Sequence, residues 1–351
     1  MKTEALRFLK ELLATPTPSG SEEAGQEIVT RYMRRYADTV TRDIHGNVHG
    51  ILNPGGKYRV MLAGHCDEIG LMVQHIDEKG YLYVSMLGGI HVPLLQAERI
   101  LIQGRKGLVP GVIGVKPIHL MSPKDRDEAV TKIHDLWVDI GAKDRKDAEK
   151  SVSVGDVATV NTGWIDLRNE RVACRGLDDR LGAFVIADVL RLIHGKKLKV
   201  AVHAVSTVQE EVGLRGATTA AYGVDPLIGI AVDVGFATDY PGVDPKIVGE
   251  AKVGKGPILH CGPTYNKKVL DLLRTAAKTA KIKTQFQPEP RGAGTDAYAM
   301  MLTRAGVASG LISIPTRYIH SPVETMALRD AENAVKLIAE FILGLKGTER
   351  W

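Results

Sequence analysis

Two hydrophobic patterns alternate along most of the chain and predict alternating helices and strands. Leu6, Leu9, Leu12 and Leu13 recur at the spacing of an amphipathic helix, which should end at the proline-containing segment 15–20. The further expected elements are a strand over 58–64, a helix from Leu181 to Ile193, strands over 198–208 and 227–232, a helix over 269–277, a strand over 310–314 and a closing helix over 334–342. This order predicts an α/β fold with a mostly parallel central sheet and helices on both faces.

Residues 70–160 interrupt this order with a different pattern. Apolar and polar residues alternate in short runs that are separated by turns containing glycine. Such runs predict a small β-barrel or β-sandwich, with one helical segment near Asp144 to Lys150. We therefore expect residues 1–69 and 161–351 to form one domain, and residues 70–160 to form an inserted β-rich domain.

The charge balance argues against a nucleic-acid-binding surface. Lys and Arg exceed Asp and Glu by only 46 − 41 = 5, and the longest basic tract is Gly195–Lys199. Aromatic residues make up 5% of the chain, whereas a nucleic-acid surface would interleave clustered positive charge with aromatic rings. The 351 residues, 44% of them apolar, suffice for the cores of about two domains.

The cysteines and the first residues indicate the compartment. Cys66, Cys174 and Cys261 are odd in number and widely separated, so we expect no disulfide framework and a reducing environment. Charged residues interrupt the N-terminal stretch where a signal peptide would be hydrophobic, and no apolar run is long enough to span a membrane. These features predict a cytoplasmic protein without a membrane partner.

Potential metal ligands follow several expected strands at the point where each strand ends. They are His65 after the strand ending at Gly64, Glu210 and Glu211 after the run ending at Val208, Asp233 after residues 230–232, and His320 after the run ending at Pro315. Because ligands bind beyond the carboxyl ends of parallel strands, these side chains should converge. A single such residue is usually a cap or a turn residue, and Asp178 could be the N-cap of the helix at Leu181. Agreement of so many positions favours one shared site.

This set of residues suits a centre with two divalent metal ions. Such a centre needs a bridging carboxylate, a bridging water and terminal ligands, with the ions about 3.5–4 Å apart. The expected ligands are His65, Asp178, Glu211, Asp233 and His320, which leaves Glu210 as the general base. Imidazole and carboxylate ligands together suit zinc, cobalt or manganese better than calcium or magnesium.

Two further residues have candidate roles near this centre. Asp67 lies two residues after His65 and could accept the second N–H of its imidazole, although an ordinary turn carboxylate is the alternative. His119 could reach a neighbouring active site across a subunit contact, although a structural role is favoured for it.

Five motifs are informative as an ordered set. They are Gly64-His65-Cys66-Asp67-Glu68-Ile69-Gly70, Leu177-Asp178-Asp179-Arg180-Leu181-Gly182, Gln209-Glu210-Glu211-Val212-Gly213, Val232-Asp233-Val234-Gly235 and Ile319-His320-Ser321-Pro322-Val323-Glu324. In order and spacing they resemble the dinuclear metallo-aminopeptidases that assemble into tetrahedral dodecamers. That family includes deblocking, leucyl and glutamyl aminopeptidases, and some of its relatives are labelled endoglucanases. The likeness covers nearly the whole chain.

The resemblance implies an architecture and a role for each motif residue. The fold would be that of the co-catalytic zinc peptidases, and the β insertion would be a dimerisation domain whose dimers build a dodecamer. The implied roles are His65 and Asp233 as terminal ligands of one ion, Glu211 and His320 as those of the other, Asp178 as the bridge, Glu210 as the general base and Asp67 as the residue that orients His65.

The resemblance also implies two local features. The peptide bond between Asp178 and Asp179 would be cis. Residues 291–297 match a Gly-Thr-Asp segment that lies beside the substrate in the family, and the role of Gly294-Thr295-Asp296 here stays open. Cys66 stands where a different small or apolar residue would be expected.

The predicted function is a metal-dependent aminopeptidase that acts on peptides with a free N-terminus. One alternative is a carboxypeptidase or amidohydrolase with the same metal centre, which peptides blocked at either end would distinguish. A glycoside hydrolase would use two carboxylates without metal, so its activity would survive chelation. A scaffold protein that keeps metal only for stability is the non-enzymatic alternative. Side-chain preference depends on tertiary neighbours that the sequence does not place.

Overall fold

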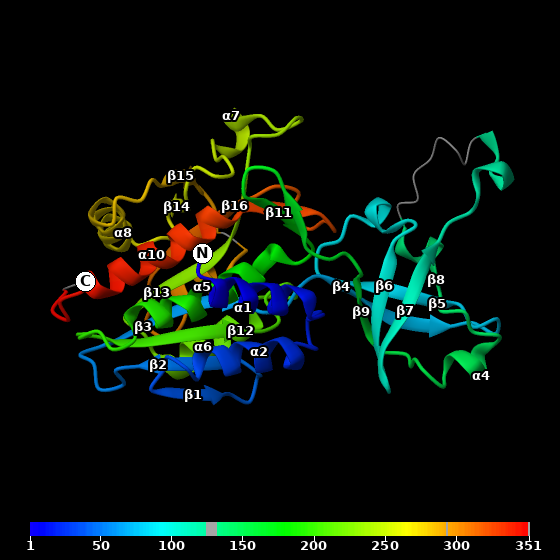
Figure 1. Cartoon of the computed structure of the whole chain (residues 1–351), viewed down its shortest axis with the longest axis horizontal. Coiled ribbons are helices and arrows are strands. Elements are labelled where there is room, and N and C mark those ends of the chain that lie inside the picture. The colour runs from blue at the N-terminus through cyan, green and yellow to red at the C-terminus, as the bar shows by residue number, and fades with distance from the viewer. Residues whose placement is uncertain (124–131, 293, 350–351) are drawn as a thin grey trace.

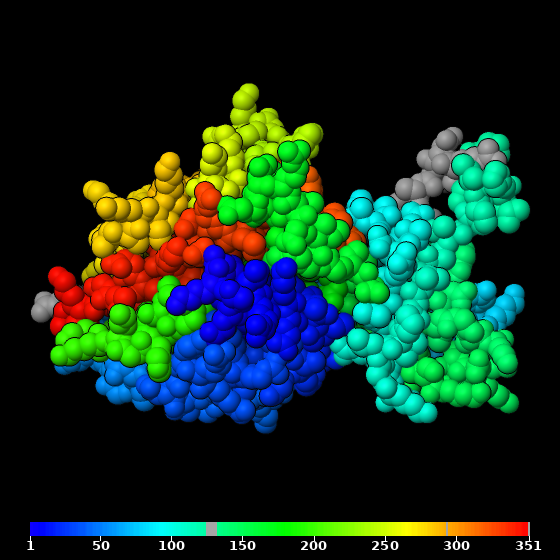
Figure 2. Space-filling model, in the orientation of Figure 1, coloured from blue at the N-terminus to red at the C-terminus, as the bar shows by residue number. Residues whose placement is uncertain are grey.

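The computed structural model describes residues 1–123, 132–292 and 294–349, which form two lobes (Figure 1). The larger lobe is a sheet with helices on both faces, and the smaller lobe is a closed β-barrel. Figure 2 shows the barrel standing beside the larger body rather than within it. The expected α/β class with a β-rich insertion is therefore confirmed.

The large sheet has four parallel strands at its centre and shorter strands at both edges. Its strands, in spatial order, are β1 (Thr39–Arg42), β2 (Val48–Leu52), β12 (Ala201–Thr207), β3 (Arg59–His65), β13 (Ile228–Phe236), β16 (Ala308–Thr316), β14 (Ile258–Cys261) and β15 (Gln285–Pro288). Strands β12, β3, β13 and β16 pair in parallel. Strand β2 is antiparallel to β12, and β14 is antiparallel to β16. The parallel centre is therefore flanked on each side by a strand that runs in the opposite direction.

Helices cover the sheet in two layers of unequal size. One face carries α1 (Thr3–Ala14), α2 (Glu23–Met33), α5 (Leu177–Ile193), α8 (Lys267–Thr279) and α10 (Leu328–Gly344). The other face carries α6 (Arg215–Val224) and α9 (Asp296–Met301). The larger apolar core lies under the first layer, where α5 is buried along nearly its whole length.

Helix α5 packs closely on the sheet because glycines stand at the contact. A Cβ on Gly64 would lie 2.4 Å from the carbonyl carbon of Gly182, and a Cβ on Gly182 would lie 2.5 Å from the carbonyl oxygen of Val232. Neither position has room for a side chain. The close approach brings the first residues of α5 beside the end of β3, where His65 lies.

The barrel consists of six strands around its own apolar core. In spatial order they are β4 (Gly70–Ile76), β5 (Leu82–Leu87), β8 (Trp137–Asp139), β7 (Gly107–Gly114), β6 (Arg99–Gly104) and β9 (Val157–Val160). Alternate residues such as Leu71, Val73, Ile100 and Ile102 fill the interior, as the alternating pattern predicts. The helical segment expected near Asp144 to Lys150 is the short helix α4 (Arg145–Ala148).

The remaining described elements are short. They are the 3₁₀ helices η1 (Val92–Leu95), η2 (Ile118–Leu120) and η3 (Ile133–Asp135), the helix α7 (Pro245–Val248), and a three-stranded sheet of β10 (Ile165–Leu167), β11 (Arg171–Cys174) and β17 (Glu324–Ala327). Within the described part of the chain, no helix has the length and apolar character needed to cross a membrane.

One strand boundary differs from the expectation. The strand expected to end at Val232 continues to Phe236, so Asp233 lies inside β13 rather than after it. The reason is the neighbouring strand β16, which stays paired with β13 through Phe236 and Thr316. Asp233 nevertheless faces the same edge of the sheet as the other candidate ligands.

Candidate metal centre

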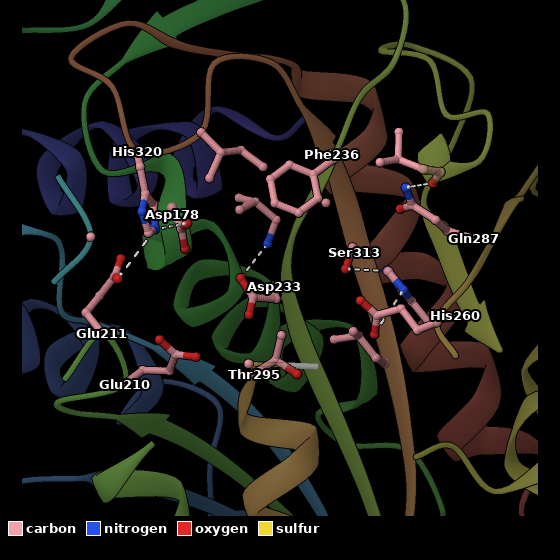
Figure 3. Close-up of a pocket in the computed structure, with 18 of the residues that line it drawn as sticks. Asp178, Glu210, Glu211, Asp233, Phe236, His260, Gln287, Thr295, Ser313 and His320 are labelled. Carbon is pink, nitrogen blue, oxygen red and sulfur yellow. Dashed lines mark hydrogen bonds and ion pairs between the residues drawn. The ribbon is translucent and has the colours of Figure 1, made fainter. Parts of the chain in front are cut away.

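A pocket of about 830 Å³ opens beyond the carboxyl ends of the central strands (Figure 3). Asp178, Glu210, Glu211, Asp233 and His320 line it, although they come from four separate parts of the chain. His65 lies beneath them at the end of β3 and is 2% exposed. The structure thus brings all the expected ligands and the expected base together.

The ligand atoms form two groups of three. The first triad is His65, Asp178 and Asp233, and the second triad is Asp178, Glu211 and His320; within each triad the candidate ligand atoms lie within 4.8 Å of one another. Asp178 belongs to both triads. Its Oδ1 lies 3.3 Å from Nε2 of His65, and its Oδ2 lies 3.2 Å from Nε2 of His320. One carboxylate therefore offers one oxygen to each triad, as a bridging ligand would.

Asp178 owes its position to the irregular start of α5. Asp178 and Asp179 have non-helical backbone angles, and the peptide bond between them is cis, as the resemblance implies. The Asp179 carboxylate accepts the backbone N–H of His65 at 3.2 Å and that of Gly182 at 2.9 Å. Asp179 thereby ties the end of β3 to the start of α5.

Glu324 is a buried carboxylate that the sequence reasoning assigned no role. It is 1% exposed, and its two oxygens accept the backbone N–H of Asp178 at 3.0 Å and of His320 at 2.9 Å. It therefore holds the backbone of two ligands that lie 142 residues apart in the sequence (320 − 178). Glu324 closes the fifth motif, which singles it out in the sequence, but that place does not predict these backbone contacts.

Asp67 supports the site in a different way from the one expected. Nδ1 of His65 lies 3.0 Å from the carbonyl oxygen of Asp67 and 3.4 Å from its carboxylate, so the backbone is the nearer partner. The carboxylate accepts the backbone N–H groups of Glu210 at 3.0 Å and Glu211 at 3.2 Å, and the hydroxyl of Ser19 at 2.7 Å. Asp67 thus positions the two glutamates as well as the imidazole.

Glu210 lies beside the triads without belonging to either. One of its carboxylate oxygens is 3.7 Å from Nε2 of His65, and the residue is 7% exposed. Burial raises the pKa of Glu210 to about 10, with help from the negative charges of Asp233 and Asp296 and against the opposing effect of His65. A nearby cation would return this pKa toward its ordinary range.

The charges of the protein itself show why the site suits cations. Hydrogen bonds to Asp178 and Glu211 raise the pKa of His320 to about 11. Burial raises the pKa of Asp233 well above its usual value, and the charge of Asp178 adds to the effect. Crowded carboxylates and imidazoles therefore compete for protons, a conflict that bound cations would relieve.

The donor set fits two divalent ions by charge and by chemistry. The ligand carboxylates Asp178, Glu211 and Asp233, together with the neighbouring Glu210, supply four negative charges when ionised, which two divalent ions would balance. Oε1 of Glu211 is buried and has no hydrogen-bond partner in the described structure, as expected of a ligand oxygen. The mixed imidazole and carboxylate donors suit zinc, cobalt or manganese.

The barrel reaches the site through a loop that follows β5. A Cβ on Gly88 would lie 3.3 Å from Oε2 of Glu211, and a Cβ on Gly89 would lie 3.1 Å from Nδ1 of His320. The two glycines therefore let the loop pass close to the second triad. The sequence reasoning missed this contact because the loop belongs to the β-rich insertion.

The segment expected beside the substrate also lies at the pocket. Gly294 and Thr295 line it, and the buried Asp296 accepts the hydroxyl of Thr207 at 2.6 Å; Ala293 lies outside the described residues. Burial raises the pKa of Asp296 to about 6. His119 lies on the exposed helix η2 and does not line this pocket.

Comparisons with known proteins agree with the arrangement. A model of the family described as M42 glutamyl aminopeptidase matches residues 46–337. The chain is 37% identical over 341 residues to a lysyl aminopeptidase of Pyrococcus furiosus, with 97% of each protein covered.

Two solved structures are similar over nearly the whole chain. A TET aminopeptidase from a marine sediment Thaumarchaeota archaeon has a TM-score of 0.92 and 36% identity, with 97% of this chain and 96% of that chain covered. The TET1 peptidase of Pyrococcus horikoshii, described as able to assemble into a tetrahedron or a large octahedral shell, has a TM-score of 0.87 and 32% identity, with 97% and 100% covered. The resemblance carried by the five motifs is thereby confirmed.

Proposed function

Because the chain belongs to the M42 glutamyl aminopeptidase family, we propose that it removes residues from the free N-terminus of peptides with two divalent metal ions as cofactors. Family membership makes it a peptide hydrolase, as the sequence predicted. The observation that carries the metal part of the proposal is the carboxylate of Asp178, which faces His65 with one oxygen and His320 with the other.

The residues of the two triads would hold the ions. His65 and Asp233 would be the terminal ligands of one ion, Glu211 and His320 those of the other, and Asp178 the bridge. When bound, two such ions polarise the scissile carbonyl, activate a water between them and stabilise the negative charge of the transition state.

Glu210 would move the proton during hydrolysis. Its carboxylate lies at the pocket beside both triads, and Asp67 holds its backbone N–H. As general base it would take a proton from the attacking water and then deliver this proton to the leaving amine nitrogen. Neither step requires Glu210 to act as a ligand.

The lining of the pocket favours an aminopeptidase over a carboxypeptidase. A carboxypeptidase must bind the negatively charged C-terminus of its substrate, normally with an arginine or a lysine. Neither residue type occurs among the described residues that line this pocket. The carboxylates at the metal end would instead attract the positively charged amine of a free N-terminus.

We further propose that the barrel, residues 70–160, is a separate domain through which dimers form and that dimers build a tetrahedral dodecamer. The barrel has several large hydrophobic residues on its exterior, among them Leu108, Val112, Ile118 and Leu120. Exposed apolar groups of this kind are typical of association surfaces. The mass of the protein in solution, measured by light scattering, tests this assembly. We also propose that the protein is cytoplasmic.

The substitution Glu210→Gln tests the assigned base. It keeps the size of the side chain but removes its ability to accept a proton, so hydrolysis of aminoacyl anilides should fall by about 10²–10⁴-fold while two ions per chain remain bound. Metal content is measured by elemental analysis of the same sample. Glu27→Gln, at an exposed position of α2, is the control and should change neither quantity. Retained activity in Glu210→Gln would refute the assignment.

The relatives do not decide which N-terminal residue the enzyme prefers. The family description refers to glutamyl substrates, whereas the relative from Pyrococcus furiosus is called a lysyl aminopeptidase. These side chains have opposite charges. The choice between them depends on the pocket of this chain.

A further inference from the structure

The pocket continues beyond the metal ligands toward the edge of the sheet. Asp233 of β13 pairs with Ser313 of β16, and the next two strands place His260 of β14 beside Gln287 of β15. Figure 3 shows His260, Gln287 and Ser313 on the side of the pocket opposite the second triad, with Asp233 between. Glu289, just after β15, lines the same side. We call His260, Gln287 and Glu289 the acceptor end of the pocket.

Two side chains of the acceptor end are buried with an unpartnered polar atom. Gln287 is 5% exposed, and its amide nitrogen donates to the carbonyl oxygen of Val248 at 2.8 Å. This bond fixes the orientation of the amide and leaves Oε1 without a partner in the described structure. Nε2 of His260 lies 2.9 Å from the hydroxyl of Ser313, and its Nδ1 likewise has no hydrogen-bond partner there. Unpaired buried polar atoms are costly unless a ligand satisfies them.

Glu289 adds a negative charge to these neutral groups. Its carboxylate accepts the hydroxyl of Tyr265 and lies 4.0 Å from Nδ1 of His260. Burial lowers the pKa of His260 to about 4, so the imidazole is neutral at physiological pH, and Nδ1 accepts a hydrogen bond in the tautomer whose Nε2–H donates to Ser313. No lysine or arginine stands among the described lining residues to neutralise Glu289. This end of the pocket therefore suits a cationic donor and disfavours an anion.

Part of the pocket wall is apolar. Phe236, Ile247, Val248 and Leu311 line the pocket together with the metal ligands and the acceptor end. Such walls suit the aliphatic stem of a long side chain whose charged tip is bound elsewhere. A short or acidic side chain would leave this surface and its acceptors unused.

The distance between the two ends matches the length of a basic side chain. Neighbouring strands lie about 4.8 Å apart and residues about 3.4 Å apart along a strand, so His260, two strands from Asp233 and two residues past the partner of Ser313, is displaced from it by about 12 Å between backbones. A lysine side chain extends roughly 6 Å from Cα to Nζ, and its α-amine adds about 1.5 Å on the other side of Cα. With a contact of about 2.9 Å at each charged end, such a residue reaches over roughly 13 Å, which is enough to bridge the two ends.

We propose that the acceptor end binds the side chain of the substrate's N-terminal residue and that the enzyme prefers lysine or arginine at that position. This inference rests on the proposed aminopeptidase function and names its substrate class. Gln287 and His260 would each accept a hydrogen bond from the basic group, and Glu289 would supply the opposite charge.

Metal-loaded wild-type enzyme provides the first test. Lysyl and norleucyl anilides differ only in the terminal ammonium, because the norleucine chain ends in a methyl group. We expect kcat/KM to be at least about tenfold higher for the lysyl substrate, as for one charge-assisted hydrogen bond, and lower for the glutamyl than for the norleucyl substrate. Equal or faster hydrolysis of the norleucyl or glutamyl substrate would overturn the inference.

Variants of Glu289 test the assigned carboxylate. Glu289→Gln should lower the lysyl-to-norleucyl ratio by about tenfold, whereas Glu27→Gln should leave the ratio unchanged. Glu289→Lys should reverse the charge preference, so that the glutamyl substrate becomes better than the lysyl one. An unchanged ratio in Glu289→Gln, together with an unreversed preference in Glu289→Lys, would remove Glu289 from the subsite.

The two proposals fail in different ways. If the metal-loaded enzyme hydrolyses none of the aminoacyl anilides, the aminopeptidase function is wrong. If it hydrolyses the neutral substrate well and the basic ones poorly, the function stands and the basic subsite is wrong.

Discussion

The two ends of the pocket are built from different parts of the sheet and by different rules. At the metal end, each ligand lies at or near the carboxyl end of a central parallel strand, or at the start of the helix packed against them. At the acceptor end, the groups come from β14 and β15, where the chain runs antiparallel to the centre. Convergence at the metal end follows from strand direction, whereas convergence at the acceptor end follows from register. The metal end should therefore determine whether the enzyme is active, and the acceptor end should determine which substrates it prefers.

Asp178→Asn provides the largest expected effect and would act at the metal end alone. The amide keeps the size of the side chain but loses the negative charge that both triads share. We expect loss of both ions and a fall in activity of at least about 10³-fold on every substrate, equivalent to several kcal/mol of transition-state stabilisation. Metal analysis and anilide kinetics check the two parts. Two tightly bound ions in this variant would contradict the bridging role.

The pH dependence of metal binding is the next largest expected effect, and it would again arise from residues of the metal end. Hydrogen bonds to Asp178 and Glu211 raise the pKa of His320 to about 11, so in chelator-treated enzyme this imidazole is protonated at neutral pH. Binding requires the neutral imidazole, so each bound ion must displace protons. Affinity should therefore increase with pH by at least about tenfold per unit between about pH 6 and pH 8.

Calorimetry in buffers with different ionisation enthalpies would count the released protons directly. Glu289→Gln serves as the control, because its carboxylate lies at the acceptor end and should not alter the slope. If metal affinity did not change with pH, the imidazoles would already be neutral without metal. This result would contradict the raised pKa of His320.

The difference between the two ends also explains what the sequence could predict. His65 follows one expected strand directly, and Glu210 and Glu211 follow another within three residues, so the expected strands alone place these side chains at one edge of the sheet. Family resemblance adds the cis bond before Asp179, which no spacing argument would suggest. The α/β class and the β insertion follow from periodicity alone. The roles of the ligands and the domain boundaries stay predictions until metal content and fragment stability are measured.

Other features could not be predicted because they depend on register or on contact between distant segments. His260 and Gln287 become neighbours only when the short strands β14 and β15 pair, and neither strand has a strong pattern. Gly88 and Gly89 reach the second triad only because the barrel closes beside it. Glu324 holds two ligands through their backbone, a contact that its place in the motif does not reveal.

Gln287→Met gives the smallest expected effect and sharpens the comparison most. The methionine has nearly the same size but lacks the acceptor oxygen, so a bound ammonium would lose one neutral hydrogen bond, worth a factor of about 3 to 10. The lysyl-to-norleucyl ratio of kcat/KM should fall by that factor, while metal content and the pH dependence of metal binding stay as in the wild type.

The carbonyl oxygen of Val248 also loses its donor, so a small decrease in Tm is expected. Since that loss affects all substrates alike, only the ratio reports on the subsite. A ratio that stays constant while overall activity falls would show that Gln287 merely supports α7, and recognition would then depend on His260 and Glu289.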